Sequence, residues 1–259
     1  MKNQSNLYPD GAALVVGGSG GTGQAISREL ARSGVNVVLT YNKNKQRAES
    51  LAADINGEGG HAEIAQLTMG EIGSIESTCE ALFAKHGRLH SVFFATGFDI
   101  PQVSIGDLSP DLWQRVLRAD AEGVFNVVHC TLPYLRKGGG GSYTHVSSAA
   151  LQRYAAMDIL SVAPKAAIEE LIKGIAKEEG VHGIRANSIA IGVIETGIFL
   201  RLRDEGVFDQ KWTDAVLSNL PLKRFGQPEE VAHMAVFLGS NKAAYTTGQL
   251  IPVDGGLGV

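Results

Sequence analysis

Residues 17–23 (GGSGGTG), near the amino terminus, have the composition of a phosphate-binding turn. The apolar run at residues 12–16 predicts a buried strand before them, and apolar residues at helical spacing from residue 25 predict a helix after them. Glycines let the backbone turn tightly and approach a ligand, while a helix start offers free N–H groups and the positive end of its dipole. A strand, a glycine turn and a helix in this order predict a site for the pyrophosphate of a dinucleotide.

The next predicted strand, residues 35–41, ends where the adenosine ribose of such a ligand would lie. An acidic side chain at this point would accept a hydrogen bond from the ribose 2′-hydroxyl of NAD, but residues 35–47 contain none. Polar and basic side chains follow instead: Asn42, Lys43, Asn44, Lys45 and Arg47. They suit a 2′-phosphate and favour NADP over NAD; the alternative is that they only form the solvated start of a helix.

Strands and helices alternate through the rest of the chain. Further strands are predicted at residues 61–67, 89–95, 143–148, 185–191 and 249–253. Helices are predicted up to residue 56 and at residues 72–86, 110–136, 161–179 and 228–238. This alternation indicates an α/β fold with a doubly wound parallel sheet and right-handed crossovers. Because no repeat or linker divides the sequence, we expect one domain over residues 1–259.

In such a sheet, ligands bind beyond the carboxyl ends of the strands. This rule places the following residues on one rim: 17–23, Asn42, Gly97, Ser148 and Gly192. The segment near residues 197–220 is polar and mixed, and we expect it to form a mobile cover over the substrate.

The composition excludes several classes of partner. The net charge is −4, so the chain has no basic footprint for nucleic acid. No apolar run reaches the about 20 residues of a membrane span, and the polar amino terminus lacks the apolar core of a signal peptide. Cys79 and Cys130 have no metal-binding or redox spacing, and two packed thiols suit a reducing cytoplasm. We therefore expect a cytoplasmic protein that binds small molecules and no metal ion.

The chain resembles the short-chain dehydrogenase/reductase family over nearly its whole length. The family pattern TGxxxGxG is matched at residues 16–23, with valine in place of its threonine, and Gly97 matches the glycine of the motif NNAG. Residues 187–196 match NxIxPG…T, with isoleucine in place of its proline, and RFGQPEEVA…VDGG is present from residue 224 to residue 256. The resemblance implies a Rossmann-like fold and an NAD(P)-dependent oxidoreductase.

The resemblance also implies a set of cofactor contacts. They fall on Gly17, Ser19, Gly21, Thr22, Gly23, Tyr41, Asn42, Lys43, Gln66, Leu67, Gly97, Lys165, Gly192, Ile194 and Thr196.

The catalytic pattern of the family is only half present. In the family, a serine lies thirteen residues before a tyrosine, the tyrosine lies four residues before a lysine, and an asparagine lies on the long helix. Ser148 and Lys165 match the serine and the lysine, whereas the tyrosine position holds Ser161 and the asparagine position holds Asp120. The resemblance implies that Ser148 binds a substrate oxygen and that Lys165 binds the nicotinamide ribose, and it leaves the reaction in doubt.

The hydroxyl group of Ser161 is a poor substitute for tyrosine. A tyrosine has a pKa of ~10 that a nearby ammonium group can lower, whereas serine is a far weaker acid and lacks the ring that carries the oxygen to the substrate. We expect Ser161 to be the N-cap of a helix that begins there, with Pro164 in its first turn. Ser109 and Pro110 start the preceding long helix in the same way.

Two residues in the loop before Ser161, namely Tyr154 and Asp158, are candidates for the missing proton donor. Lys165 either binds the cofactor or is only a solvated helix lysine, and Asp120 could hold it through an ion pair or a water molecule. A carboxylate at residue 120 would oppose a developing alkoxide, which counts against ordinary ketone reduction.

Three functions remain compatible with these residues. The first is an NADP(H)-dependent oxidoreductase that transfers a hydride to a small organic acceptor with a C=O, C=N or C=C group; an iminium ion or an activated C=C needs less acid help than a ketone. The second is a non-redox cyclase or lyase, and the third is a cofactor-binding regulator without turnover. The resemblance also implies a homotetramer that pairs through the helices near residues 110–136 and 161–179, with the last strand at a second interface.

Overall fold

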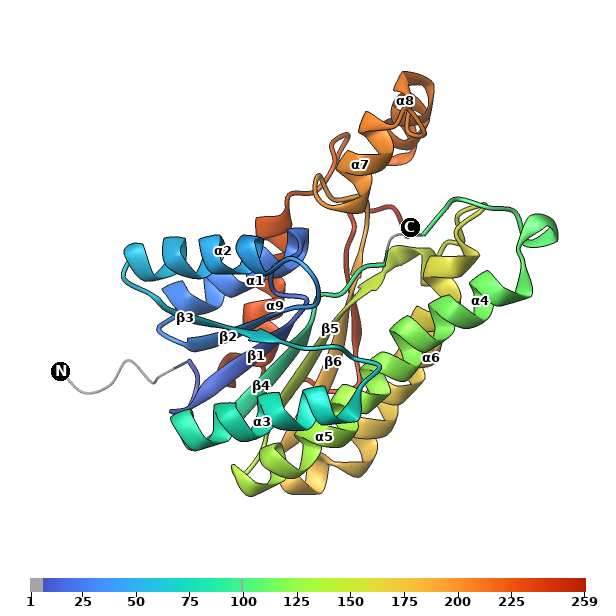
Figure 1. Ribbon diagram of the computed structural model, residues 1–259. Coiled ribbons are helices and arrows are strands. Elements are labelled where there is room, and N and C mark those ends of the chain that lie inside the picture. Colours follow the sequence, from blue (N-terminus) through green and yellow to red (C-terminus); the bar gives the residue numbers. More distant parts are fainter. Residues whose placement is uncertain (1–6, 99) are drawn as a thin grey trace.

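The computed structural model describes residues 7–98 and 100–259, which form a seven-stranded sheet (Figure 1). The strand order is β3-β2-β1-β4-β5-β6-β7, and every pair of neighbours is parallel. The strands are β1 (Ala12–Val16), β2 (Asn36–Tyr41), β3 (His61–Gln66), β4 (Leu89–Phe94), β5 (Gly141–Ser148), β6 (Ile184–Ile191) and β7 (Leu250–Val253). The expected doubly wound parallel sheet is confirmed, and its order reverses between β1 and β4.

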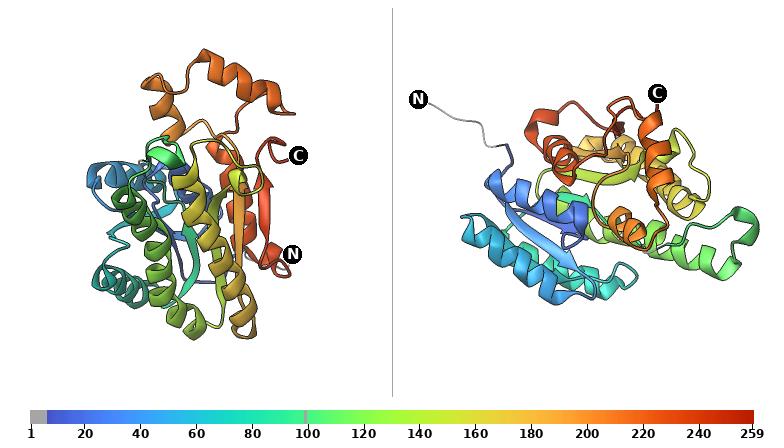
Figure 2. Two further views of the ribbon diagram at one scale, coloured as in Figure 1. Left: turned by 90° about the vertical axis from the view of Figure 1, so that its right-hand side faces the viewer. Right: turned by 90° about the horizontal axis from the view of Figure 1, so that it is seen from above.

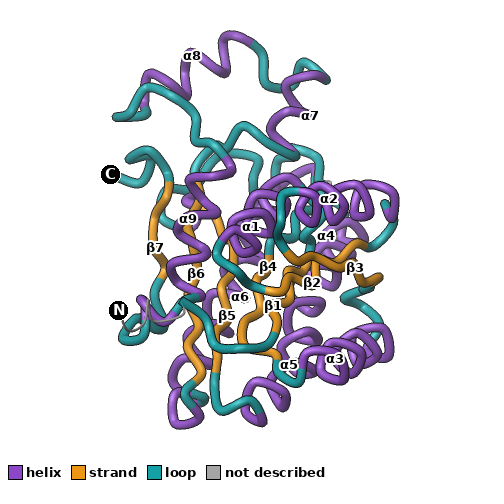
Figure 3. Tube along the Cα trace, turned by 90° about the vertical axis from the view of Figure 1, so that its left-hand side faces the viewer, coloured by secondary structure: helices purple, strands orange, loops and turns teal. Residues whose placement is uncertain are grey.

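Helices cover both faces of this sheet (Figures 1 and 3). One face carries α1 (Gly21–Arg32), α2 (Lys45–Gly57) and α9 (Pro228–Gly239). The other face carries α3 (Ile72–His86), α5 (Gly123–Lys137) and α6 (Ile159–Glu178). Within the described part of the chain, no helix is long and apolar enough to cross a membrane.

Burial on both faces explains why β1 is continuously apolar. In β1, Ala13 and Val15 pack under α1 and α9, whereas Leu14 packs under the helices of the other face. Cys79 and Cys130 belong to this second core and are free, buried thiols, as expected from their spacing. The core therefore holds the sheet rigidly between two helical layers, and the carboxyl ends of the strands form the rim on which the site residues lie.

The long helix predicted near residues 110–136 is interrupted. It consists of α4 (Pro110–Leu117), a π-helical turn (Arg118–Glu122) and α5. Its start is as expected, because the N–H of Leu112 donates to Ser109 Oγ at 3.2 Å and a proline is its first residue. The π-helical turn rotates the following side chains relative to a regular α-helix. Asp120 lies within this turn and is 3% exposed.

The expectation that Ser161 is a helix N-cap is wrong. Helix α6 begins at Ile159, and the N–H of Ser161 donates to the carbonyl of Asp158 at 3.0 Å. Ser161 is therefore in the first turn, and Pro164 lies inside the helix, where it has no N–H to donate to the carbonyl of Leu160. Leu160 and Pro164 are both buried, so packing extends the helix past the boundary that the proline suggests.

The segment near residues 197–220 forms two helices that project beyond the carboxyl ends of the strands (Figures 1 and 2). They are α7 (Ile198–Asp204) and α8 (Gln210–Asn219). An aromatic cluster joins them to each other and to the following loop: Phe199, Phe208, Trp212 and Phe225. The rings of Phe208 and Trp212 stack with their centroids 3.8 Å apart. The position of α7 and α8 above the rim suits a cover over the substrate. The mobility of this cover stays a prediction.

Candidate active site

The glycine turn lies where the strand order reverses, between the ends of β1 and β4. Gly17 has a φ of +77°, and a Cβ there would lie 2.9 Å from the carbonyl oxygen of Ala95. A Cβ at Gly23 would lie 2.2 Å from the carbonyl oxygen of Gly17, so both positions require glycine. The N–H of Gly17 also donates to Thr40 Oγ1 at 3.1 Å. Thr40 was not identified from the sequence as a residue that supports the glycine turn. The signal available was a hydroxyl side chain within an otherwise apolar strand.

The start of α1 is open to an anion. Gly20 is its N-cap and offers no side-chain acceptor to the first N–H groups of the helix. A Cβ at Gly21 would lie 2.2 Å from Thr196 Oγ1, so the chain after β6 lies directly against the turn. The N–H of Ser19 donates to the carbonyl of Thr40 at 3.3 Å, and Thr22 follows in the first helical turn. This cradle of N–H and hydroxyl groups fits a phosphate group.

Two residues expected at the adenosine end turn their side chains away from the rim. Tyr41 and Leu67 are 8% and 3% exposed, and their side chains pack in the two cores. The alternation of side chains along a strand explains this placement, since Tyr41 follows Val37 and Leu39 on the same face. A contact from Tyr41 or Leu67 to a nucleotide would therefore come from the backbone.

The other expected residues of the adenosine end lie on the surface. Gln66 Nε2 donates to the carbonyl of Asn42 at 3.3 Å, which joins the ends of β2 and β3. Lys45 Nζ lies 3.3 Å from Glu49 Oε1, whereas none of the residues described in the structure pairs with the exposed ammonium group of Lys43. Lys43 is thus a cation at the end of β2 that is available to a ligand.

Ser148 is the last residue of β5, at the centre of the rim. Its Oγ accepts a hydrogen bond from the N–H of Ala150 at 3.1 Å. The hydroxyl proton is consequently free to point at a ligand, so Ser148 can donate a hydrogen bond to a substrate oxygen or nitrogen.

Lys165 and Asp120 form the ion pair that the sequence suggested. Lys165 Nζ lies 3.6 Å from Asp120 Oδ2, and the side chains are 15% and 5% exposed. The pair joins α6 to the π-helical turn at the carboxyl end of the sheet. A neutral asparagine at this place would leave the full positive charge of the lysine in the site, whereas Asp120 offsets it.

Asp158 is the second carboxyl group near Lys165. It is the residue before α6 and is partly buried. Burial raises the pKa of the Asp158 carboxyl group above its usual range, and the positive charge of Lys165 and a hydrogen bond with the Gln102 side chain offset part of this rise. Tyr154, the other candidate for the proton donor, is 51% exposed. Gln102 lies in a loop that gave no signal in the sequence.

Ser161 lies between these charged groups on α6. Residues 158, 161 and 165 are three and four positions apart, so they share one face of the helix. The Ser161 hydroxyl makes no hydrogen bond to any residue that the structure describes. The place of the missing tyrosine is thus occupied by a short side chain with Asp158 on one side and Lys165 on the other.

Apolar groups surround the polar centre. Ile100, Val116 and Leu160 form a small buried cluster beside the start of α6, and Trp113 packs against it. Ile198, at the start of α7, would lie 3.5 Å from a Cβ at the exposed Gly97. The site is therefore bordered by aliphatic and aromatic side chains on both the α4 side and the cover side.

The remaining residues expected to contact the cofactor, Gly192, Ile194 and Thr196, lie in the loop after β6. A Cβ at Gly192 would lie 2.8 Å from the Cα of Asp254, so this glycine permits a close approach of β6 to the carboxyl-terminal segment. Ile194 is buried and pairs with Gly226 through an isolated bridge. These contacts hold the loop that carries Thr196 against the glycine turn.

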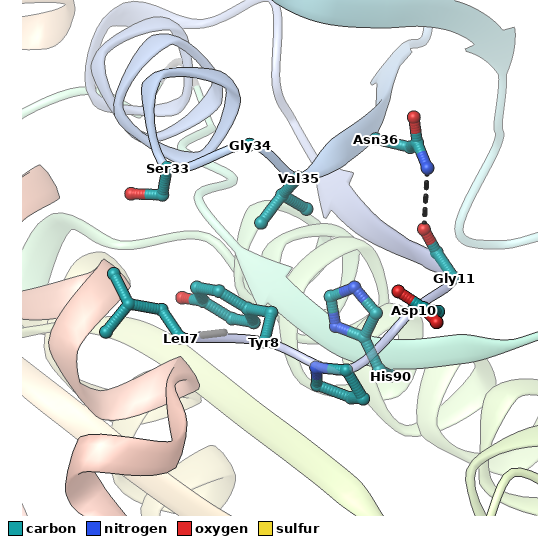
Figure 4. Close-up of a pocket in the computed structure, with 10 residues that line it drawn as sticks. Leu7, Tyr8, Asp10, Gly11, Ser33, Gly34, Val35, Asn36 and His90 are labelled. Carbon is teal, nitrogen blue, oxygen red and sulfur yellow. Dashed lines mark hydrogen bonds between the residues drawn. The ribbon is translucent and has the colours of Figure 1, made fainter. Parts of the chain in front are cut away.

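A cavity of about 240 Å³ lies at the other end of the strands, next to the amino ends of β1, β2 and β4 (Figure 4). Its lining includes Tyr8, Asp10 and the buried His90. None of the residues that line it lies on the rim described above, so it is separate from the candidate active site.

Comparisons with known proteins agree with this architecture. The family model described as enoyl-(acyl carrier protein) reductase matches residues 17–258. A 3-oxoacyl-[acyl-carrier-protein] reductase, FabG, from Thermotoga maritima is 32% identical over 244 residues, which cover 94% of this chain and 96% of the relative.

Solved structures are similar over the same length. A short-chain type dehydrogenase/reductase from Mycobacterium ulcerans has a TM-score of 0.90 at 27% identity, with 96% of this chain and 90% of that chain covered. A short-chain dehydrogenase/reductase from Serratia marcescens has a TM-score of 0.87 at 24% identity, with 98% and 100% covered, and supports the fold. The chain therefore belongs to the short-chain dehydrogenase/reductase family and is an oxidoreductase.

Proposed function

We propose that this protein is an NADP(H)-dependent reductase of small organic molecules with an atypical active site. The observation that carries the proposal is the presence on one rim of a glycine cradle, a hydroxyl donor at Ser148 and the Lys165–Asp120 pair. The relatives named as 3-oxoacyl-[acyl-carrier-protein] reductases support reduction as the direction of the reaction.

The residues present fit a nicotinamide dinucleotide. The backbone of residues 17–23, the start of α1 and the Thr196 hydroxyl would hold its pyrophosphate, and Lys43 would face the adenosine ribose. Lys165 would bind the other ribose. When bound in its reduced form, the dinucleotide supplies a hydride to the substrate.

The chain's own residues define the substrate side. Ser148 would donate a hydrogen bond to a polar atom of the substrate, and the apolar cluster of Ile100, Val116 and Leu160 would exclude water from its hydrocarbon part. Ser161 is a far weaker acid than tyrosine, so it is a poor general acid for the oxygen on which negative charge develops during ketone reduction. The proposed enzyme therefore reduces simple ketones poorly.

The cofactor preference is tested by binding. We expect NADPH to bind more tightly than NADH, because no described residue pairs with the Lys43 ammonium group and no acidic residue occupies residues 35–47. Fluorescence titration of both dinucleotides measures the preference. The double variant Lys43→Ala with Lys45→Ala should reduce it by about tenfold, since one charge contact to a phosphate contributes on the order of 1 kcal/mol or more.

A matched control keeps this experiment specific. Lys85→Ala removes a lysine on α3 that pairs with Glu63 of β3 and is not among the expected cofactor contacts. This variant should therefore leave the affinities for NADPH and NADH unchanged. Equal affinity for NADH and NADPH in the wild type, or a preference that survives the double variant, would remove the basis for NADP.

A further inference from the structure

We propose that the acceptor of this enzyme is a C=N group, bound as a cationic iminium ion whose nitrogen pairs with the carboxylate of Asp158. The inference rests on the proposed function and names the substrate class of the same site. It follows from the charges around Ser161, from the place of Asp158 just before α6 and from the acid that the site lacks.

The charges around Ser161 sum to a negative value. Asp120 and Lys165 form an ion pair at 3.6 Å and nearly offset each other. Asp158 then adds a second carboxyl group, and the neighbours that act on it are the Lys165 ammonium group and the amide of Gln102. Among the described residues that surround Ser161, two carboxyl groups thus face one lysine, and a ligand with one positive charge would balance them.

Asp158 lies next to the residues at the family's tyrosine and lysine positions. It precedes α6 and shares a helix face with Ser161 and Lys165. Side chains on a helix lean toward its amino terminus, so the lysine extends along this face toward Asp158. Ser161, between them, lacks the ring that a tyrosine would place at this position.

A ketone does not suit this arrangement. Its reduction builds negative charge on oxygen, and a neighbouring carboxylate raises the energy of that charge. No hydroxyl with the acidity of tyrosine is available at residue 161 to neutralise it. An iminium ion behaves in the opposite way, since it is attracted by the same carboxylates and loses its charge when it is reduced.

The partial burial of Asp158 supports the same conclusion. Burial raises the pKa of Asp158 because the isolated carboxylate is poorly solvated there. A cation beside it would supply the missing stabilisation, whereas a neutral ketone would not.

The step balances without an acid from the protein. The iminium carbon gains a hydride from the reduced nicotinamide dinucleotide, and the electrons of the C=N π bond become the lone pair on nitrogen. A neutral amine and the oxidised dinucleotide result, and nitrogen keeps every proton that it brought. The protein's task is to bind the cation through the carboxylate of Asp158 and to exclude water.

Binding of a permanent cation tests the inference without turnover. Isothermal titration calorimetry on the full chain would compare N-methyl-3,4-dihydroisoquinolinium with 1-tetralone, a neutral ketone of similar shape. We expect the cation to bind at least about tenfold more tightly, and Asp158→Asn to remove most of this difference, as expected for one partly buried charge pair. Asp111→Asn, which removes an exposed carboxylate on α4, should leave both affinities unchanged. Equal binding of the two ligands, or a difference that survives in Asp158→Asn, overturns the inference.

Turnover separates this inference from the proposed function. Stopped-flow fluorescence of NADPH should show rapid oxidation by the isoquinolinium ion and little by 1-tetralone, and Asp158→Asn should raise KM for the cation more than it lowers kcat. Oxidation by the ketone alone, or by neither compound while NADPH binds, contradicts a C=N acceptor and leaves the cofactor site intact. Failure to bind NADPH at all contradicts the proposed function, and the calorimetric comparison then still decides whether the cation site exists.

Discussion

Ser161 shows how one residue separates the fold of this protein from the usual reaction of its family. Ser148, Lys165 and the π-helical turn with Asp120 all lie at one rim of the sheet, and the fold as a whole is that of the family. The hydroxyl of Ser161 differs from that of tyrosine in acidity and in reach, and neither property depends on the fold. We therefore expect this chain to bind a dinucleotide without the proton donor that a tyrosine would supply.

Replacement of Ser161 by alanine should change little. The structure places this residue inside the first turn of α6 and shows no hydrogen bond from its hydroxyl to the described residues, so no cap is lost. We expect the free energy of unfolding in urea to change by less than about 0.5 kcal/mol, and activity toward a C=N acceptor to stay within a few-fold. Loss of turnover with normal NADPH binding would instead make Ser161 part of the chemistry.

At the scale of elements, the glycine turn depends on a contact with a distant segment. Thr196 follows β6 in the chain, yet its hydroxyl occupies the space where a Cβ of Gly21 would lie. The start of α1 and the loop after β6 therefore form one unit, and a change in either should affect the cradle for the phosphates.

Gly21→Ala tests this unit. Its Cβ would lie 2.2 Å from Thr196 Oγ1 and 3.0 Å from the backbone nitrogen of Gly197, so the two segments must move apart. We expect the dissociation constant of NADPH to rise by at least about tenfold, and Thr196→Ala in the same chain to restore part of the affinity. Gly73→Ala is the control, because nothing lies within 4 Å of its Cβ position on α3. A normal NADPH affinity in Gly21→Ala would place the phosphates elsewhere.

At the scale of the whole molecule, the surface retains apolar side chains that the core does not use. Phe125 on α5 is 52% exposed, and its ring stacks on His129 with the centroids 6.3 Å apart. Phe237 on α9 is exposed as well. These side chains lie on two different faces of the sheet, which suits an assembly with two kinds of interface.

We expect the protein to be a homotetramer with α5 at one interface. Multi-angle light scattering at micromolar concentration should return four times the mass of the chain. Phe125→Glu should shift the mass toward a dimer or a monomer, because it buries a charge at the proposed contact, whereas Ile105→Glu, on an exposed loop turn, should not. A monomer mass for the wild type would refute the assembly.

We expect the burial of His90, which lines the cavity before the amino ends of the strands, to make stability depend on pH. His90 is buried there with its ring centroid 5.3 Å from that of Tyr8, and burial together with the nearby Arg88 lowers the pKa of His90 to about 4 (Figure 4). The unfolded chain, with a histidine pKa near 6.5, therefore binds this proton more readily than the folded chain. His90 should destabilise the fold as the pH falls from about 6.5 to about 4, by up to about 3 kcal/mol.

Urea unfolding at several pH values measures this dependence. The stability of His90→Gln should fall less steeply with acid than that of the wild type over this window, whereas His61→Gln, at an exposed position, should follow the wild type. Parallel curves for wild type and His90→Gln would show that His90 does not titrate as its burial implies.

The amino-acid sequence by itself determined the local features of this protein. The glycine turn, the apolar strands and the start of α4 at Ser109 depend on residues close together in the chain, and their periodicity and turn chemistry are local properties. The doubly wound order follows from the alternation of such elements. The position of Ser148 at the rim was predictable from the end of its strand, whereas the role of Lys165 was implied by the resemblance to the family.

Only the tertiary structure decided how distant side chains meet. The burial of Leu160 and Pro164 moves the start of α6 ahead of the boundary predicted from sequence, and the pleat of β2 turns Tyr41 into the core. The contact of Thr196 with Gly21 and the effects of Lys165 and Gln102 on Asp158 join segments from separate parts of the chain. Burial and charge depend on every element that packs around a group, and no local pattern in the sequence contains that information.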